Sequence, residues 1–251
     1  MLNVTKEKLK NKYKINDRVI SLYEKSLEDI KDEFTYYDEV REYNQLKVLN
    51  ALQEEGISEA HFTNSSGYGY GDIGRDSLDK VYARIFNSES ALVRPHFVNG
   101  THALSCALFG NLRPGDTMLS VCGTPYDTLH GFIGIGSDKK IGSLKEYGVN
   151  YHQIELTTDN KVDFKSIEKY LGENNKVKVV HIQRSTGYGW RKSLSIGEIK
   201  DIIDFVKGIC KDIICFVDNC YGEFIDIMEP TDVGADLVAG SLIKNIGGGI
   251  A

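Results

Sequence analysis

Residues 195–218 read SIGEIKDIIDFVKGICKDIICFVD. The first part has the pattern of an amphipathic helix, because Ser195 and Glu198 have the spacing of a capping box and isoleucines recur every three or four residues after them. Residues 213–217 are a short apolar run of the kind that forms a buried strand. A helix that leads directly into a buried strand is typical of an α/β fold with a parallel sheet.

The same alternation continues on both sides of this stretch. It predicts a turn at 113–116, helices at 77–86 and 101–112, and further strands at 91–98, 117–122, 177–182 and 237–239. Strands that alternate with helices form a mainly parallel sheet with helices on both faces. We expect this α/β domain to span residues 61–251.

The N-terminal part has a different pattern. Within residues 5–56, apolar side chains such as Val19, Leu22 and Leu27 follow the spacing of one helix face, and lysines and glutamates occupy the other face. A second apolar run ends at Gly56, a natural helix stop. Residues 1–60 are therefore predicted to form a helical segment that precedes the α/β domain.

The composition is that of an ordinary soluble protein, with 41% hydrophobic and 26% charged residues. A net charge of −6 argues against a nucleic-acid partner and against a basic membrane-binding surface. The five cysteines form no Cys-x-x-Cys pair and have no histidine at metal-ligand spacing, which favours buried, reduced thiols and no metal site. This cysteine pattern, with no signal-peptide pattern at the N-terminus, predicts a cytoplasmic protein.

Residues 64–74 contain four glycines within the stretch GYGYGDIG and are predicted to be a loop. Ordering so many glycines is entropically unfavourable, and a functional site is the usual reason for it. These residues do not follow an apolar strand, which argues against a nucleotide-binding oxidoreductase.

Polar side chains follow several of the predicted strands, at the edge where ligands bind in parallel sheets. Gly100 would let the backbone approach a ligand, and Thr101 with the first N–H groups of a helix would bind an anion. The alternative is a plain helix N-cap by Thr101 or Asn99. His102 lies at the start of the same helix, where it is equally suited to packing. Tyr126 would lie at this edge and stack on a planar ligand, or else cover the core.

Asp218 ends a strongly apolar strand, where a carboxylate needs a cation or hydrogen-bond donors. A metal-binding or helix-capping role is the competing interpretation. Lys244 follows the strand at 237–239 and Ser241, and it leads into a glycine cluster. It is either a solvated lysine or a working amine. Since it lies 26 residues after Asp218, both side chains are expected at one edge of the sheet.

These stretches together resemble a pyridoxal-phosphate enzyme of fold type I, and more closely the methionine gamma-lyase/cystathionine beta-lyase-like family often labelled aluminium resistance protein. The resemblance extends in order across nearly the whole chain. It rests on six motifs: 67–76 (GYGYGDIGRD), 98–103 (VNGTHA), 123–127 (GTPYD), 182–185 (IQRS), 217–223 (VDNCYGE) and 240–245 (GSLIKN).

The resemblance implies that Lys244 forms a Schiff base with pyridoxal 5'-phosphate, that Asp218 pairs with the pyridine nitrogen and that Tyr126 stacks on the ring. The implied phosphate site consists of Gly100, Thr101 and Ser241, with His102 beside them. Tyr68 or Tyr70, together with Arg75, would reach the phosphate of a neighbouring subunit, so that the active unit is a homodimer or homotetramer.

The implied activity is that of a carbon–sulfur lyase. A sulfur-containing amino acid would displace Lys244 from the cofactor, Lys244 would take the Cα proton, and the thiol would leave by beta- or gamma-elimination, with Tyr126 as a proton donor. The chain departs from the family at Ile246, where a proline is expected. A smaller C-terminal domain, with an arginine for the substrate carboxylate, is expected to be missing. The rival hypothesis is a truncated, non-catalytic chain that binds cofactor weakly or serves as an assembly partner.

Overall fold

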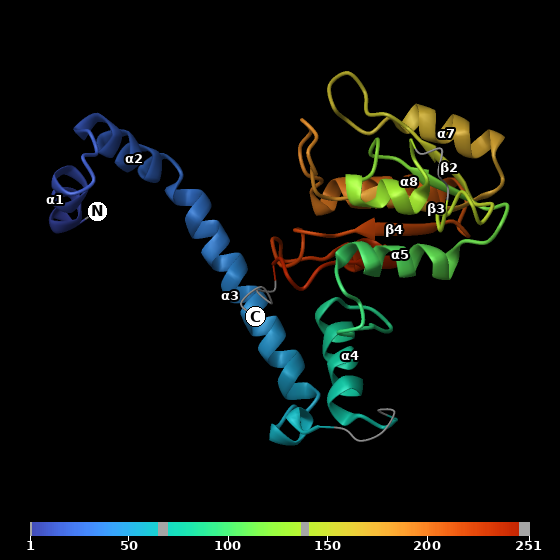
Figure 1. The fold of residues 1–251 in the computed structure, drawn as a ribbon, viewed down its shortest axis with the longest axis horizontal. Helices are drawn as coiled ribbons and strands as arrows, with labels where there is room; N and C mark the ends of the chain where they lie inside the picture. Colours follow the sequence, from blue (N-terminus) through green and yellow to red (C-terminus); the bar gives the residue numbers. More distant parts are fainter. Residues whose placement is uncertain (1, 65–69, 137–140, 246–251) are drawn as a thin grey trace. The chain divides into compact units, whose positions relative to one another are not determined.

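The computed structural model describes residues 2–64, 70–136 and 141–245 (Figure 1). The chain divides into two compact units, Met1–Gln45 and Leu46–Ala251. The division falls inside the longest helix, α3 (Lys31–Glu54). The predicted domain boundary at residue 60 stays a prediction.

The first unit contains α1 (Asn3–Asn11), α2 (Asp17–Asp29) and the start of α3, which confirms the predicted helical segment. The Asn16 side chain caps α2 by accepting a hydrogen bond from the Arg18 N–H (2.7 Å). The apolar side chains that predicted the face of α2 are at least 37% exposed, so this face is not covered within the unit. They are Val19, Leu22, Tyr23, Leu27 and Ile30.

The second unit contains a five-stranded sheet in the order β2-β1-β3-β4-β5, in which every neighbouring pair is parallel. This confirms the predicted parallel sheet. The strands are β1 (Thr117–Ser120), β2 (Asn150–Gln153), β3 (Val177–Gln183), β4 (Ile214–Asp218) and β5 (Leu237–Ala239).

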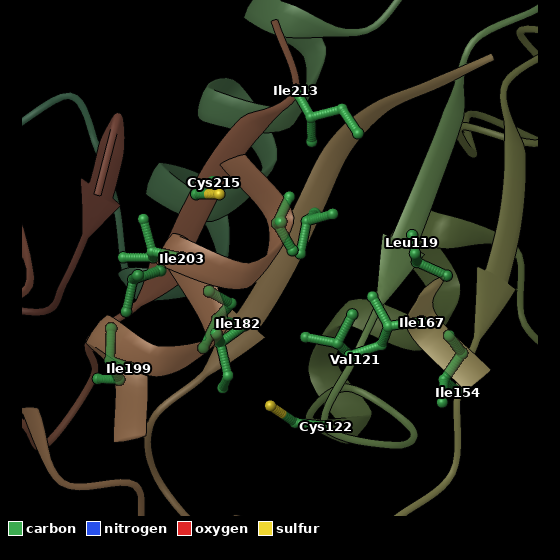
Figure 2. Close-up of a cluster of buried hydrophobic side chains, with 14 of the residues drawn as sticks. Leu119, Val121, Cys122, Ile154, Ile167, Ile182, Ile199, Ile203, Ile213 and Cys215 are labelled. Atoms are coloured by element: carbon green, nitrogen blue, oxygen red, sulfur yellow. The ribbon is translucent and has the colours of Figure 1, made fainter. Parts of the chain in front are cut away.

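Helices cover both faces of this sheet, as predicted. α7 (Phe164–Glu173) and α8 (Ile196–Ile209) pack on one face, over the buried side chains shown in Figure 2. α5 (Gly100–Asn111) and α6 (His130–Ile133) pack on the other face. The remaining elements are α4 (Ile73–Ile85) and the short helices η1 (Glu59–Phe62), η2 (Asp127–Leu129) and η3 (Pro230–Val233).

The start of α8 shows how the sequence produces this layer. Ser195 N donates to Glu198 Oε2 (2.8 Å) and Glu198 N donates to Ser195 Oγ (3.2 Å), which is the predicted capping box. Ile199, Ile203 and Val206 then bury their side chains against the sheet. The helix delivers the chain to β4, so that Asp218 comes to lie at the carboxyl edge of the sheet.

Residues 91–98 are not a strand, and this prediction is wrong. The Val93 N–H donates to Asp79 Oδ1 (2.9 Å) instead of to a neighbouring strand, and Arg94 Nη2 contacts Asp79 Oδ2 (2.6 Å). Pro95 in addition has no N–H to donate. The segment is therefore held to α4, and the apolar residues at 91–93 do not enter the sheet.

Other differences are smaller. β2 and α7 were not among the predicted elements. β2 has no apolar run that would indicate a strand, because it is a largely polar edge strand, Asn-Tyr-His-Gln. α4 begins at Ile73, inside the predicted loop, and a side chain at Gly74 would overlap with the His61 carbonyl oxygen. All five cysteines are free thiols as predicted, but Cys106 is exposed and Cys210 is half-buried. In the described ranges, no helix is long and apolar enough to cross a membrane.

Candidate functional site

The candidate site lies where three neighbouring strands end. Gln183 at the end of β3 is in register with Asp218 at the end of β4, and Asp218 is in register with Ala239 at the end of β5. The Asn219 N–H continues this pairing by donating to the Ala239 carbonyl (2.9 Å). The loops that follow these strands therefore start side by side, as expected for a ligand-binding edge.

Asp218 is 3% exposed, and its Oδ1 accepts a hydrogen bond from Cys220 N (3.1 Å). Burial raises the pKa of this carboxyl group, while the Cys220 N–H and the nearby Lys244 favour its charged form. A buried carboxylate with so little compensation is suited to hold a cationic, proton-bearing group.

Lys244 lies in the turn that follows β5, where its N–H donates to the Ser241 carbonyl (3.1 Å). Its Nζ lies over the Tyr221 ring, 4.1 Å from the ring centre. This cation–π contact places the amine next to the loop that follows β4. The structure thus brings Lys244 and Asp218 to one edge of the sheet, as the sequence predicts.

The start of α5 packs against the same turn. Asn99 caps the helix, because its side chain accepts a hydrogen bond from His102 N (2.9 Å), and the first N–H groups of the helix remain for an anion. A side chain at Gly100 would come within 3.3 Å of Cys220 Sγ and Ser241 Cβ. This close approach places Ser241 beside the helix N-terminus. The Thr101 hydroxyl donates to Thr128 Oγ1 (2.8 Å).

Tyr126 follows β1 and is held by its backbone, since its N–H donates to Gln183 Oε1 (2.7 Å). Its ring stacks on that of Tyr188, with ring centres 5.4 Å apart and an angle of 27° between the planes. Hydrogen bonding with Tyr188 raises the pKa of Tyr126 to about 12. Gly187, at a φ of 57°, packs its backbone against the same ring.

A cavity of ≈ 450 Å³ opens beside Tyr126, between the loop after β1 and the loop after β3. Its walls carry aromatic side chains, two carboxylates and a guanidinium group. These are Tyr126, Tyr188, Trp190, Asp127, Glu155 and Arg191.

Of the other predicted site residues, His102 lies in the first turn of α5, Tyr70 precedes α4 and Arg75 belongs to α4. His102 is exposed, its Nδ1 accepts a hydrogen bond from Val98 N (3.3 Å), and its ring meets Phe97 edge to face. Tyr70 is 90% exposed, and Arg75 lies in the first turn of α4, with Nε 3.5 Å from Asp76 Oδ1. Tyr68 lies outside the described residues. The roles of all four stay predictions.

Sequence reasoning assigned no role to Gln183, Tyr221 or Glu223. Gln183 fixes the backbone of Tyr126, and the Tyr221 ring contacts the Lys244 amine. Glu223 Oε1 accepts a hydrogen bond from Ser241 N (2.9 Å). Each of these residues ends a strand or follows one within a few positions, and this location is the signal that could have identified them.

This arrangement fits pyridoxal phosphate. The N-terminus of α5 with Ser241 can hold a phosphate group, the buried Asp218 can hold a protonated ring nitrogen, and the Lys244 amine can bond to an aldehyde. The narrow space at Gly100 leaves the backbone as the group that approaches the phosphate.

Comparison with known proteins identifies the family of the chain. The family profile described as methionine gamma-lyase matches residues 19–251. A carbon–sulfur lyase involved in aluminium resistance from Clostridium novyi NT is 70% identical, with a TM-score of 0.94, and the match covers 100% of this chain and 59% of that one. YnbB of Bacillus subtilis (strain 168), an uncharacterised protein, is 51% identical over 85% of this chain and 50% of its own length.

A more distant likeness concerns the fold alone. The pyridoxal-5'-phosphate-dependent protein YhfS of Escherichia coli has a TM-score of 0.62 at 15% identity, over 81% of this chain and 51% of that one. The chain thus spans about half to three fifths of the length of the proteins that it matches.

Proposed function

The chain belongs to the methionine gamma-lyase family, and from this premise we propose that it is a pyridoxal-phosphate-dependent carbon–sulfur lyase acting on a sulfur-containing amino acid. The observation that carries the proposal is the placement of Asp218 and Lys244 at one edge of the sheet, close enough to influence each other electrostatically. When bound, pyridoxal phosphate supplies an electron sink for the charge that develops at the substrate Cα.

Two residues do the central chemistry in this proposal. Lys244 provides the amine that binds the cofactor aldehyde, and once a substrate amine displaces it, its Nζ takes the proton from Cα. Asp218 keeps a proton on the pyridine nitrogen. Its burial supports this role, because a carboxylate at a site with so little water interacts strongly with the cation beside it.

The remaining residues bind and orient. The backbone of Gly100 and Thr101 and the Ser241 hydroxyl hold the phosphate, with His102 at the same helix start. Tyr126 stacks on the cofactor ring and donates its hydroxyl proton to the leaving sulfur. The raised pKa keeps its hydroxyl protonated near neutral pH, so that a proton is present for the second role.

A second subunit completes the site in this proposal. Tyr68 or Tyr70, with Arg75, reaches the phosphate bound by the neighbouring copy, in a homodimer or homotetramer. The high exposure of Tyr70 supports this role. The five free thiols are typical of a reducing compartment and support a cytoplasmic location.

The decisive experiment is a spectral titration of the protein with pyridoxal phosphate, followed by borohydride reduction and peptide mapping. We expect a visible absorbance band and a label on Lys244 alone. Lys244→Ala should lose both, and the matched control Lys165→Ala, at an exposed position on α7, should keep both. Label on another lysine, or a band that survives in K244A, rules the proposal out. Elimination is then assayed by thiol release from cystathionine, methionine and cysteine.

A further inference from the structure

Two loops meet at the candidate site. Residues 219–224 follow β4, and residues 240–245 form the turn after β5 that carries Lys244. Asn245 joins them from one side, because its Nδ2 donates to the carbonyls of Tyr221 (2.7 Å) and Glu223 (2.9 Å). Asn245 is exposed, so its hydrogen bonds hold the turn from the solvent side only. Another group has to hold the buried side of the turn.

Glu223 is that group. Its side chain is 3% exposed, and Oε1 accepts the hydrogen bond from the backbone N–H of Ser241 at 2.9 Å. A side chain at Gly240 would overlap with the same oxygen, so the carboxyl group lies directly against the backbone of the turn. The second oxygen, Oε2, is buried and has no hydrogen-bond partner among the described residues.

The loop that carries Glu223 is itself firmly held. Tyr221 and Phe224 have φ angles of 69° and 61°, a conformation that bulky residues rarely adopt. Arg184, which is buried, donates to the Gly222 carbonyl (2.7 Å), and Glu229 accepts the Phe224 N–H (2.9 Å). Bonds on both sides of Glu223 therefore fix the position from which its carboxyl group reaches the turn.

We propose that Glu223 is a positioning residue for Lys244: its carboxyl group fixes the backbone of the Ser241–Lys244 turn against the loop after β4 and thereby sets where the lysine amine lies. Its significance for catalysis rests on the proposed function. Its effect on the backbone of the turn does not rest on that function. The Ser241 N–H donates to Glu223 and the Lys244 N–H donates to the Ser241 carbonyl, and both hydrogen bonds are made within this chain.

A carboxylate on a side chain of the length of glutamate is well suited to this position. An acceptor that carries charge forms a stronger hydrogen bond with a backbone N–H than a neutral one does. Burial raises the pKa of Glu223, and the neighbouring Asp218 acts in the same direction, while the Ser241 N–H and Lys244 favour the carboxylate. An aspartate would be one methylene too short to make the same contact from the same anchor.

The test is hydrogen exchange of the cofactor-free protein, followed in a peptide that covers residues 239–245. In Glu223→Ala and Glu223→Asp, the Ser241 amide should exchange faster by at least about tenfold, the factor that corresponds to losing a hydrogen bond to a charged acceptor. Glu223→Gln keeps an acceptor oxygen at the same reach, although a neutral one, and should restore most of the protection. Val206→Ala, in the core between α8 and the sheet, is the control for general destabilisation.

A second measurement keeps the proposal testable if E223A does not fold. Gly240→Ala pushes the turn away from Oε1 and should accelerate the same exchange, and the combined variant Gly240→Ala/Glu223→Asp should be less impaired than the sum of the two changes. Additive effects, or exchange in E223D and E223A no faster than in V206A, overturn the proposal.

The role at the cofactor is read from visible circular dichroism after loading with pyridoxal phosphate. E223D should lose at least about half of the cofactor signal, because a loosened turn no longer holds one orientation, and E223Q should keep it. An unchanged signal in E223D overturns the link to Lys244. Failure of the wild-type protein to be labelled at Lys244 refutes the proposed function instead, and the exchange result stands apart from it.

Discussion

The amine of Lys244 lies 4.1 Å from the centre of the Tyr221 ring, and Tyr221 follows Asp218 by only three residues in the chain. The end of β4 therefore contributes the carboxylate of the candidate site, and the loop that follows it contributes the ring on which the Lys244 amine lies. A cation over an aromatic face is stabilised by about 0.5–1 kcal/mol at an exposed position. This contact gives the Lys244 amine a defined position. The amine would have to leave the Tyr221 ring to react with a cofactor aldehyde.

The first prediction concerns this contact. Tyr221→Leu removes the aromatic face on which the Lys244 amine lies, and loss of this contact, about 0.5–1 kcal/mol, should make Lys244 react two- to fivefold faster with an amine-specific acylating reagent. Tyr221→Phe keeps the ring and is the matched control. The rate is measured by mass spectrometry of the peptide that contains Lys244. Equal rates in Y221L and Y221F would show that the ring does not stabilise the amine.

The second prediction concerns Asp218. Burial raises the pKa of Asp218, so the folded state favours the neutral acid. Ionisation of this group therefore lowers the stability of the fold as the pH rises above the ordinary pKa of an aspartate. Asp218→Asn keeps an oxygen for the Cys220 N–H and cannot ionise. At pH 7 the cofactor-free D218N protein should therefore melt at a higher temperature than the wild type.

D218N should at the same time bind pyridoxal phosphate at least about tenfold more weakly, since the partner of the ring nitrogen is lost. Asp201→Asn, at an exposed position on α8, is the control for both measurements. Lower thermal stability of D218N would contradict the idea that this carboxylate is retained for a ligand. Unchanged cofactor affinity would contradict its pairing with the ring.

The third prediction concerns His181, which is fully buried in β3 with no hydrogen-bond partner on either ring nitrogen among the described residues. Burial, followed by the charge of Arg191, lowers its pKa to about 4. The unfolded chain takes up a proton near pH 6.5 and the folded chain does not, so stability is lost as the pH falls from 6.5 towards 4, by up to about 3 kcal/mol.

The variant His181→Leu should not show this loss of stability. The free energies of unfolding of variant and wild type are measured from pH 7 to pH 4, and their difference should change as the pH falls. His96→Leu, at an exposed position, should leave the pH profile unchanged. A constant difference between H181L and wild type across this range would show that His181 does not titrate as described.

Much of the site could be predicted from the sequence, because hydrophobic pattern and topology determine it. The capping box, the apolar residues of α8 and β4, and the short strand β5 are local signals that act together. In a parallel sheet the carboxyl ends of neighbouring strands meet, so Asp218 and the segment that carries Lys244 had to come together. No knowledge of the side-chain contacts was needed for this step.

The rest depends on contacts that a pattern does not contain. Residues 91–98 have the composition of a strand, but the Val93 N–H donates its hydrogen bond to the Asp79 side chain and not to a neighbouring strand. Glu223 would pass for a surface glutamate, and its partner is a backbone N–H 18 residues away. Tyr188 and Tyr126 come from different loops, and their stacking follows from the pairing of β1 with β3.

The fourth prediction concerns that aromatic pair. Hydrogen bonding with Tyr188 is the main cause of the raised pKa of Tyr126, which lies at about 12. Tyr188→Phe keeps the stacked ring and removes the hydroxyl, so the pKa of Tyr126 should fall towards 10. The change is measured by ultraviolet titration of the phenolate, with Tyr126→Phe to assign the signal and Tyr147→Phe, an exposed tyrosine elsewhere, as the control. An unchanged titration of Tyr126 in Y188F would refute the coupling.

The last prediction separates a site shared between subunits from a site built by one chain. Arg75→Ala should weaken cofactor binding, and Lys244→Ala should abolish trapping of the cofactor by borohydride. If Arg75 acts on the site of the neighbouring copy, a heterodimer of the two variants contains one site with both Lys244 and Arg75 intact. Random reassociation places half of the chains in heterodimers, so about a quarter of the wild-type trapping should return at low pyridoxal phosphate concentration.

The control for this mixing experiment is a matched mixture of K244A with Asp218→Asn. Lys244 and Asp218 lie at the edge of one sheet in one chain, so each heterodimer site lacks one of them and no trapping should return. If Arg75 serves its own chain, the mixture of R75A and K244A behaves like this control. That result would remove Arg75, and with it Tyr68 and Tyr70, from the neighbouring site, and it would leave the roles of Lys244 and Asp218 unchanged, because those rest on contacts within the sheet edge.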